Sequence, residues 1–278
     1  MFENRKLVIA TKHKKESVIS PLIEQSLKVK CFVPDNFDSD IFGTFSGEIE
    51  RKNDAFTTVR NKCRLAMKQS NCDLGIASEG SFGAHPKVFF ASANEEVLIF
   101  IDLKNNLEIV VKEISFDTNF DSQKIDNKLD LKQFINKSKF PSHGIILKNE
   151  AENFIECKKD FQNKEQIIEC YHYFINKFGI CFAETDMRAM YNPTRMLVIE
   201  KATQKLIEKI KSCCPKCKTL GFDIKSVKPG LRCELCNFPT KSTLVHIYEC
   251  EKCKYILEKQ FPNNKKSEDP TYCDFCNP

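Results

Sequence analysis

Four Cys-x-x-Cys loops follow one another near the end of the chain: Cys214-Pro-Lys-Cys217, Cys233-Glu-Leu-Cys236, Cys250-Glu-Lys-Cys253 and Cys273-Asp-Phe-Cys276. Two thiolates separated by two residues can turn inward on one tight loop and supply half of a tetrahedral metal site. A second loop completes the site, and the gaps between these loops are typical of four-cysteine zinc sites. We therefore expect two zinc ions, with rubredoxin-like iron as the alternative metal.

The way in which the four loops pair is open from the spacing alone. Pairing of neighbouring loops would give tandem zinc ribbons, whereas pairing of the first loop with the third would give one interleaved module. Because each half carries its own hairpin-length spacer, the sequence favours tandem ribbons over residues 211–278. Four thiolates leave no position for water, so both sites should be structural and should supply most of the folding free energy of this tail. Cys213 and His246 are possible substitute ligands, but the complete set of loops favours bystander roles for both.

Length and composition predict two units. A chain of 278 residues with 41% hydrophobic residues can bury one large core of about 200 residues and carry a small appendage. No apolar run approaches the roughly 20 residues that cross a bilayer, and the N-terminus lacks the pattern of a signal peptide. We expect a cytoplasmic protein with reduced thiols and no membrane partner. The other seven of its fifteen cysteines should be small buried hydrophobes without chemistry: Cys31, Cys63, Cys72, Cys157, Cys170, Cys181 and Cys213.

The charge of the chain gives little support for a nucleic-acid partner. Its formal net charge is +5. Each zinc ion with four thiolates contributes about −2, which brings the whole chain to about +1. An electrostatic surface for a phosphate backbone is therefore not expected.

Hydrophobic periodicity predicts alternating strands and helices in residues 1–210. Asn192 before Pro193 is a helix cap followed by the preferred first-turn proline. Glu79 to Gly83 reads as a turn after a short strand. The alternation predicts a layered α/β domain with a central mixed sheet. The expected strands are 6–11, 74–78, 97–103, 107–116, 144–147 and 180–183, and the expected helices are 18–27, 53–69, 129–137, 164–177 and 193–210. Pro21 implies a kink in the first helix or a start after Ser20.

Polar residues gather in four segments, three at predicted strand ends and a fourth before the helix that starts at Asn53. Thr11 to Lys15, between a strand and a helix, suits an anion but is equally typical of solvated surface. Ala77 to Pro86 carries a carboxylate, Glu79, into a glycine-rich stretch. Carboxylates and arginines in 184–195 suit Mg²⁺ and phosphate, or pair with one another as structural salt bridges. Gly43 to Arg51 is a lid or a connector.

Several motifs in this order resemble an uncharacterised bacterial family of unknown function over nearly the full length: GTFSGEIER, ASEGSFGAHP, ETDMRA, NPTRM and the Cys-x-x-Cys tail. ATKHKKESV and EIERKNDAFTTVRNKCRLA also resemble, more weakly, the opening motif and the following helix of the inosine-triphosphate pyrophosphatase superfamily. That superfamily's paired acidic residues are reduced here to Glu79, and its closing motif is absent. The resemblance implies an inosine-triphosphatase-like fold, phosphates facing Lys12 and Lys15, and a metal on Glu79. It also implies that Arg188 and Arg195 stand in for the superfamily's late basic residues.

These observations lead to one main hypothesis and one alternative. The main hypothesis is a Mg²⁺- or Mn²⁺-dependent hydrolase of a nucleotide or related phosphoanhydride. Its catalytic carboxylates would be Glu79, Glu184 and Asp186, and its substrate-binding residues would be Lys12, Lys15, Arg188 and Arg195. The alternative is a non-enzymatic protein whose zinc ribbons bind nucleic acid or a protein, with Lys252, Lys254 and Tyr255 as contacts. Substrate identity and oligomeric state stay open.

Overall fold

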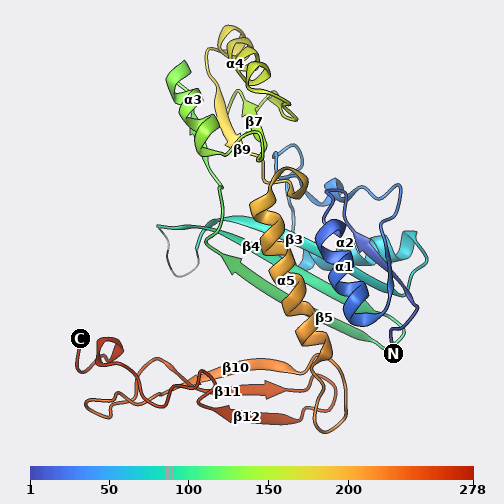
Figure 1. The fold of residues 1–278 in the computed structure, drawn as a ribbon, viewed down its shortest axis with the longest axis vertical. Coiled ribbons are helices and arrows are strands. Elements are labelled where there is room, and N and C mark those ends of the chain that lie inside the picture. Colours follow the sequence, from blue (N-terminus) through green and yellow to red (C-terminus); the bar gives the residue numbers. More distant parts are fainter. Residues whose placement is uncertain (86–87, 89) are drawn as a thin grey trace. The chain divides into compact units, whose positions relative to one another are not determined.

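The computed structural model of the chain, shown in Figure 1, describes all residues except 86, 87 and 89. Pro86, the last residue of the polar segment that carries Glu79, therefore lies outside the described residues. The chain divides into two units, Met1–Leu206 and Ile207–Pro278. No helix within the described residues combines the length and the apolar character needed to cross a bilayer.

A mixed five-stranded sheet forms the centre of the N-terminal unit, as predicted. Its strand order is β2-β1-β3-β4-β5. The first three of these strands run parallel to one another, and the last three run antiparallel. The strands are β1 (Lys6–Ala10), β2 (Lys30–Phe32), β3 (Leu74–Ala84), β4 (Ser92–Asp102) and β5 (Leu107–Ser115).

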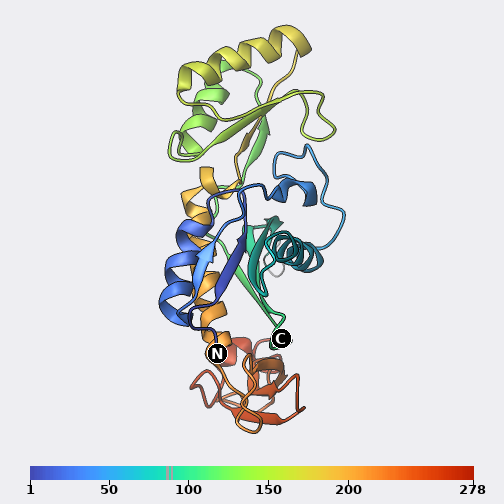
Figure 2. The same cartoon turned by 90° about the vertical axis from the view of Figure 1, so that its right-hand side faces the viewer.

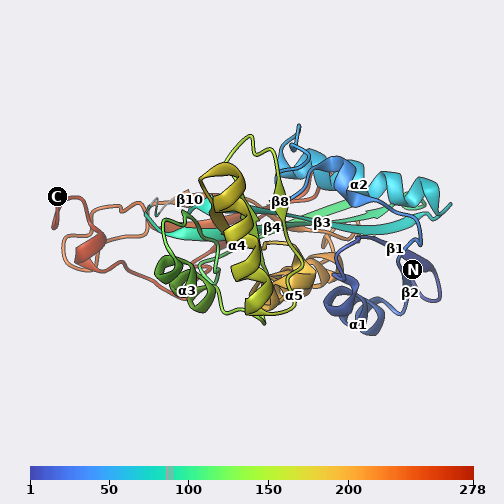
Figure 3. The ribbon, with the colours of Figure 1, turned by 90° about the horizontal axis from the view of Figure 1, so that it is seen from above.

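Three helices cover the two faces of this sheet. Figure 3 shows α2 (Ala55–Gln69) on one face and α1 (Glu16–Leu27) and α5 (Pro193–Lys211) on the other. The apolar stripe of α2, which includes Val59, Cys63 and Ala66, packs into the core cluster beneath β3 and β4. Side chains cap two of the helices: Asp54 accepts a hydrogen bond from the backbone of Thr57 at the start of α2, and Asn192 accepts one from Arg195 at the start of α5.

The predicted turn at Glu79 to Gly83 is wrong, because these residues continue β3 and pair with β4 as far as Ala84. The glycine at position 80 has a packing role. A Cβ atom there would lie 2.7 Å from Glu96 Oε1 and would also overlap the Arg195 guanidinium. Glycine in this strand therefore marks a close approach of buried side chains to the backbone.

A second, antiparallel sheet in the N-terminal unit has the order β6-β9-β7-β8. Figure 2 shows its two helices together on one side, and apolar residues of both helices share one buried cluster with β7 and β9. The sequence predicted four of these six elements, but not that they form a separate sheet. The elements are β6 (Ser122–Lys124), α3 (Lys128–Lys137), β7 (Ile145–Lys148), β8 (Cys157–Lys158), α4 (Lys164–Phe178) and β9 (Phe182–Thr185).

The C-terminal unit contains a three-stranded antiparallel sheet of order β10-β11-β12. Each strand lies between two consecutive Cys-x-x-Cys loops. Short 3-10 turns complete the structure: η1 (Ser39–Phe42), η2 (Ala189–Tyr191) and η3 (Pro270–Tyr272). The three strands are β10 (Asp223–Pro229), β11 (Thr243–Glu249) and β12 (Ile256–Gln260).

Candidate metal centres and anion pocket

The eight cysteines of the Cys-x-x-Cys loops form two groups in which all sulfur atoms lie within 4.8 Å of one another. Sulfur atoms of different loops are 3.5 to 3.9 Å apart. A tetrahedral zinc ion with Zn–S bonds of about 2.3 Å requires a separation of about 3.8 Å, so the donor sets fit this ion. The first group is Cys214, Cys217, Cys250 and Cys253, and the second is Cys233, Cys236, Cys273 and Cys276.

These groups correct the predicted pairing, because the first loop joins the third and the second joins the fourth. The reason lies in the strands between the loops. A seven-residue strand such as β10 or β11 spans roughly 20 Å, which separates the loops at its two ends. Antiparallel strands then return every second loop to the same end of the sheet. Cys213 and His246 belong to neither group, as expected.

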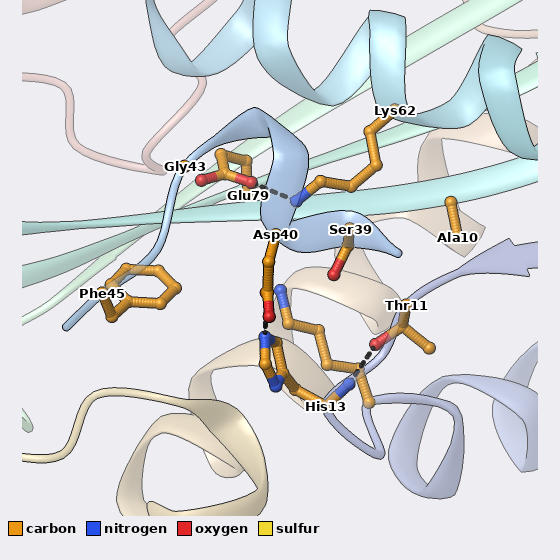
Figure 4. Close-up of a pocket in the computed structure, with 10 residues that line it drawn as sticks. Ala10, Thr11, His13, Ser39, Asp40, Gly43, Phe45, Lys62 and Glu79 are labelled. Carbon is orange, nitrogen blue, oxygen red and sulfur yellow. Dashed lines mark hydrogen bonds and ion pairs between the residues drawn. The ribbon is translucent and has the colours of Figure 1, made fainter. Parts of the chain in front are cut away.

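A pocket of about 310 Å³, including space open to solvent, lies beside the end of β1 in the N-terminal unit. Figure 4 shows side chains from the β1–α1 loop, η1, α2 and β3 around it. Ligands commonly bind at the carboxyl ends of parallel strands. We call this site the anion pocket. Its lining residues are Ala10, Thr11, His13, Lys15, Ser39, Asp40, Gly43, Phe45, Lys62 and Glu79.

Lys15 is one of two buried lysines that line the anion pocket, with 4% of its surface exposed. Its Nζ donates hydrogen bonds to the backbone oxygen of Ser78 at 3.2 Å and to the hydroxyl at 2.9 Å. Within the described part of the chain, Lys15 forms no ion pair with a carboxylate. Burial, reinforced by the charge of Arg195, lowers the pKa of Lys15 to about 7.

Glu79 lies in the same pocket but already has cationic partners. Lys62 of α2 forms a short, buried ion pair with it, and Arg51 Nη1 lies 3.4 Å away. Arg51 also donates to the backbone oxygen of Gly80 at 3.1 Å. Burial opposes the ionisation of Glu79, but the charges of Lys62 and Lys15 outweigh burial and lower its pKa. Glu79 is therefore an ionised carboxylate whose negative charge is balanced by Lys62 and Arg51.

Asp40 is the second carboxylate of the pocket. It accepts hydrogen bonds from Lys12 Nζ at 2.9 Å and forms a 3.0 Å contact with His13 Nε2. Lys12 itself is largely exposed, pairs also with Asp38 and does not line the pocket. Burial and the charge of Lys15 lower the pKa of His13 to about 4, so this imidazole is neutral at pH 7.

Arg195 lies behind the pocket wall in a fully buried ion pair with Glu96, at 2.6 Å. Its guanidinium carbon lies 4.2 Å from the ring centre of Phe45, a residue that lines the pocket. The ring of Phe82 covers it at 5.3 Å. Arg195 therefore contributes charge to the pocket from behind Phe45 and is not itself among the lining residues.

The other predicted site residues have separate partners. Glu184 pairs with Lys148 at 2.6 Å, and Asp186 pairs with Arg188 at 2.6 Å. None of Glu184, Asp186 and Arg188 lines the anion pocket. Among the described residues, Glu79, Glu184 and Asp186 form no group that could hold one metal ion. The salt-bridge interpretation, which the sequence left open, matches this geometry, and a catalytic role for Glu184 and Asp186 stays a prediction.

Two of the residues proposed to bind a partner through the zinc module, Lys254 and Tyr255, also have contacts. Lys254 pairs with Glu249 and Glu251, and the ring of Tyr255 lies near that of Phe222. The apolar loop residues Leu235 and Phe275, in contrast, are about seven-tenths exposed.

Sequence reasoning missed Lys62, although a signal was present. The apolar stripe of α2 recurs at Val59, Cys63 and Ala66, and Lys62 lies inside this stripe rather than on the opposite face. A lysine on the buried face of an amphipathic helix needs a partner, and that partner is Glu79. Asp40 and Phe45 had no comparable signal, because they lie in irregular segments.

The fold and the site define an α/β protein with a charged pocket and a C-terminal unit that offers two four-cysteine metal sites. The chain belongs to the family described as domain of unknown function (DUF6671), whose model matches residues 62–278. GTFSGEIER and the Lys12–Lys15 loop lie outside the matched part, so the match is shorter than the sequence suggested.

Comparisons with individual proteins add little. No curated protein matches the chain. One similar solved structure is the crystal structure of protein VC0702 from Vibrio cholerae, with 8% identity, 74% of this chain covered, 94% of that chain covered and a TM-score of 0.34. A TM-score this low carries no argument, and the likeness to the inosine-triphosphate pyrophosphatase superfamily stays a hypothesis.

Proposed function

We propose that the anion pocket binds a phosphate-bearing small molecule and that the protein hydrolyses a nucleotide or related phosphoanhydride with a divalent cation. The observation that carries the proposal is the buried Lys15, whose ammonium has hydrogen-bond partners but no counter-ion among the residues that the structure describes. A buried charge without a counter-ion is costly, and a phosphate oxygen would supply the missing charge. The β1–α1 loop adds the backbone N–H groups that favour anions at the start of a helix.

The donor set of the pocket fits a divalent cation only when the cation arrives with its phosphate. Mg²⁺ and Mn²⁺ prefer oxygen ligands, and the lining offers Glu79, Asp40 and the hydroxyls of Thr11 and Ser39. Lys62 and Lys15 would repel a free cation. When bound, the cation would polarise a phosphate oxygen. Glu79 would hold the cation, and Lys15 and Lys62 would orient the substrate.

A substrate screen tests the proposal. Purified full-length protein with Mg²⁺ or Mn²⁺ should release phosphate or pyrophosphate from at least one common or non-standard nucleoside triphosphate. Glu79→Gln should reduce the rate at least 100-fold, because the amide keeps the shape but loses the charge. Glu95→Gln, on the neighbouring strand and outside the pocket, is the control and should keep full activity.

Binding is measured separately from turnover. Lys15→Met should weaken binding of the same triphosphate at least tenfold, whereas Lys6→Met, an exposed lysine of β1, should not. If no triphosphate turns over and Lys15→Met binds as well as the wild type, the hydrolase proposal fails. The alternative of a zinc module for a protein partner would then take its place, supported by the exposed Leu235 and Phe275.

A further inference from the structure

The charges of the anion pocket are paired unevenly. Asp40 already binds Lys12 and His13, and Glu79 already binds Lys62 and Arg51. Both carboxylates of the lining therefore have two basic partners each. Lys15 is left with the neutral oxygens of Ser78. An empty pocket of this kind disfavours a charge on Lys15, whereas a bound phosphate favours one.

This uneven pairing of charges affects the protonation of Lys15. Because burial and nearby cations lower the pKa of Lys15 to about 7, much of its amine is neutral at pH 7.5 in the empty pocket. A phosphate dianion at hydrogen-bond distance would stabilise the ammonium form and raise the pKa again. The free energy of binding then includes the uptake of a proton.

We propose that the anion pocket takes up the terminal phosphate of its ligand together with one proton, which Lys15 accepts. This inference rests on the proposed function, since it assumes a phosphate in the pocket. It adds that the ligand should present a phosphate dianion at the Lys15 end. It also adds that affinity should fall as the pH rises above 7.

Two other groups near Lys15, Glu79 and His13, bear on the assignment of this proton. Glu79 stays ionised because its pKa is lowered. His13 is the one competitor, since its low pKa could rise when an anion binds. The ligand contributes with the opposite sign, because phosphates among cations release protons. The charged groups that face Lys15 are His13 from the β1–α1 loop, Lys62 from α2, Glu79 from β3, Glu96 from β4 and Arg195 from α5.

Calorimetric titration with imidodiphosphate, a pyrophosphate analogue that resists hydrolysis, tests the inference on the full-length, zinc-loaded protein. Titrations at pH 7.5 in buffers of different ionisation enthalpy give the number of protons taken up. A pKa of about 7 in the empty pocket predicts that Lys15 takes up about 0.75 proton per ligand, and the difference between the wild type and Lys15→Arg measures this share apart from protons released by the ligand. Between pH 8 and 10 the affinity should fall by about tenfold per pH unit.

Three variants assign the proton. Lys15→Arg keeps its charge at all these pH values, so it should bind the analogue without proton uptake. Lys15→Met should lose both the affinity for imidodiphosphate and the proton uptake. This variant tests the role of Lys15 if arginine does not fit in the pocket. His13→Asn should still take up the proton, and Lys6→Met should behave as the wild type.

The outcomes separate this inference from the proposed function. A proton balance of the wild type equal to that of Lys15→Arg, or uptake that disappears in His13→Asn, overturns the role of Lys15 and leaves the phosphate site standing. Failure of the wild type to bind imidodiphosphate or any nucleoside triphosphate overturns the phosphate site and this inference with it.

Discussion

Gly80 shows how one small residue makes room for a buried ion pair. Arg195 and Glu96 have no exposed side-chain surface, and they are placed against the backbone of β3 at this position. A buried ion pair contributes only if its geometry is good and its remaining donors are bonded. Arg195 meets this condition through the backbone oxygen of Met187 and the rings of Phe45 and Phe82.

We expect Gly80→Ala to destabilise the N-terminal unit by about 1–3 kcal/mol or more, because the added methyl group forces the ion pair to move. Gly83→Ala is a matched control in the same strand, since no atom of the described residues lies within 4 Å of a Cβ atom there. Its effect should be close to zero or slightly stabilising. Urea unfolding measures the change in stability for both substitutions, and hydrogen exchange of β3 and β4 amides locates it in the sheet. Equal effects of the two substitutions would contradict this account of Gly80.

At the residue scale, the sequence indicated residues of the pocket but not their partners. Lys15 and Glu79 were predicted, and both line the anion pocket. Arg195 was predicted to grip phosphate, but its counter-ion Glu96 is 99 residues away in the chain and left no local signal. Pairing between distant residues depends on how strands and helices pack, which residue spacing does not reveal.

At the element scale, the direction of each strand determines which Cys-x-x-Cys loops lie together in one four-cysteine group. A Cys-x-x-Cys loop supplies two ligands whatever its partner is, so the spacing identifies the ligands and not their pairing. One strand between consecutive loops moves the chain to the opposite end of the sheet. The prediction of tandem ribbons assumed that each spacer forms a hairpin. This assumption is wrong, because each spacer contributes a single strand to the sheet.

Double cysteine variants test the crossed pairing. Cys217→Ser with Cys253→Ser removes two ligands of one group, so one zinc ion per chain should remain. Cys217→Ser with Cys236→Ser removes one ligand of each group, so both ions should be lost or bound much more weakly. Elemental analysis of protein purified without added metal measures the zinc content. The opposite result, with one ion retained by the second variant only, would restore sequential pairing.

At the scale of the whole molecule, the two units have different sources of stability. The N-terminal unit has large apolar clusters on the α2 face of its first sheet and between its second sheet and two helices. The buried cluster around the first cysteine group consists of Phe222 and two cysteines of that group, Cys214 and Cys250. Composition and the loop motifs predicted a boundary at residue 210, and the two units of the structure divide after Leu206. The second sheet of the N-terminal unit was not predicted, because short strands such as β6 and β8 carry too few residues for a periodic signal.

Removal of zinc should therefore unfold the two units unequally. The full-length protein should contain two zinc ions per chain, and a zinc chelator should remove the protection of β10, β11 and β12 amides from hydrogen exchange. Amides of β3 and β4 should keep their protection, because apolar burial holds that sheet together. Added zinc should restore protection in β10 to β12. Loss of protection in both units at the same chelator concentration would show that the metal sites stabilise the whole chain and would contradict this division.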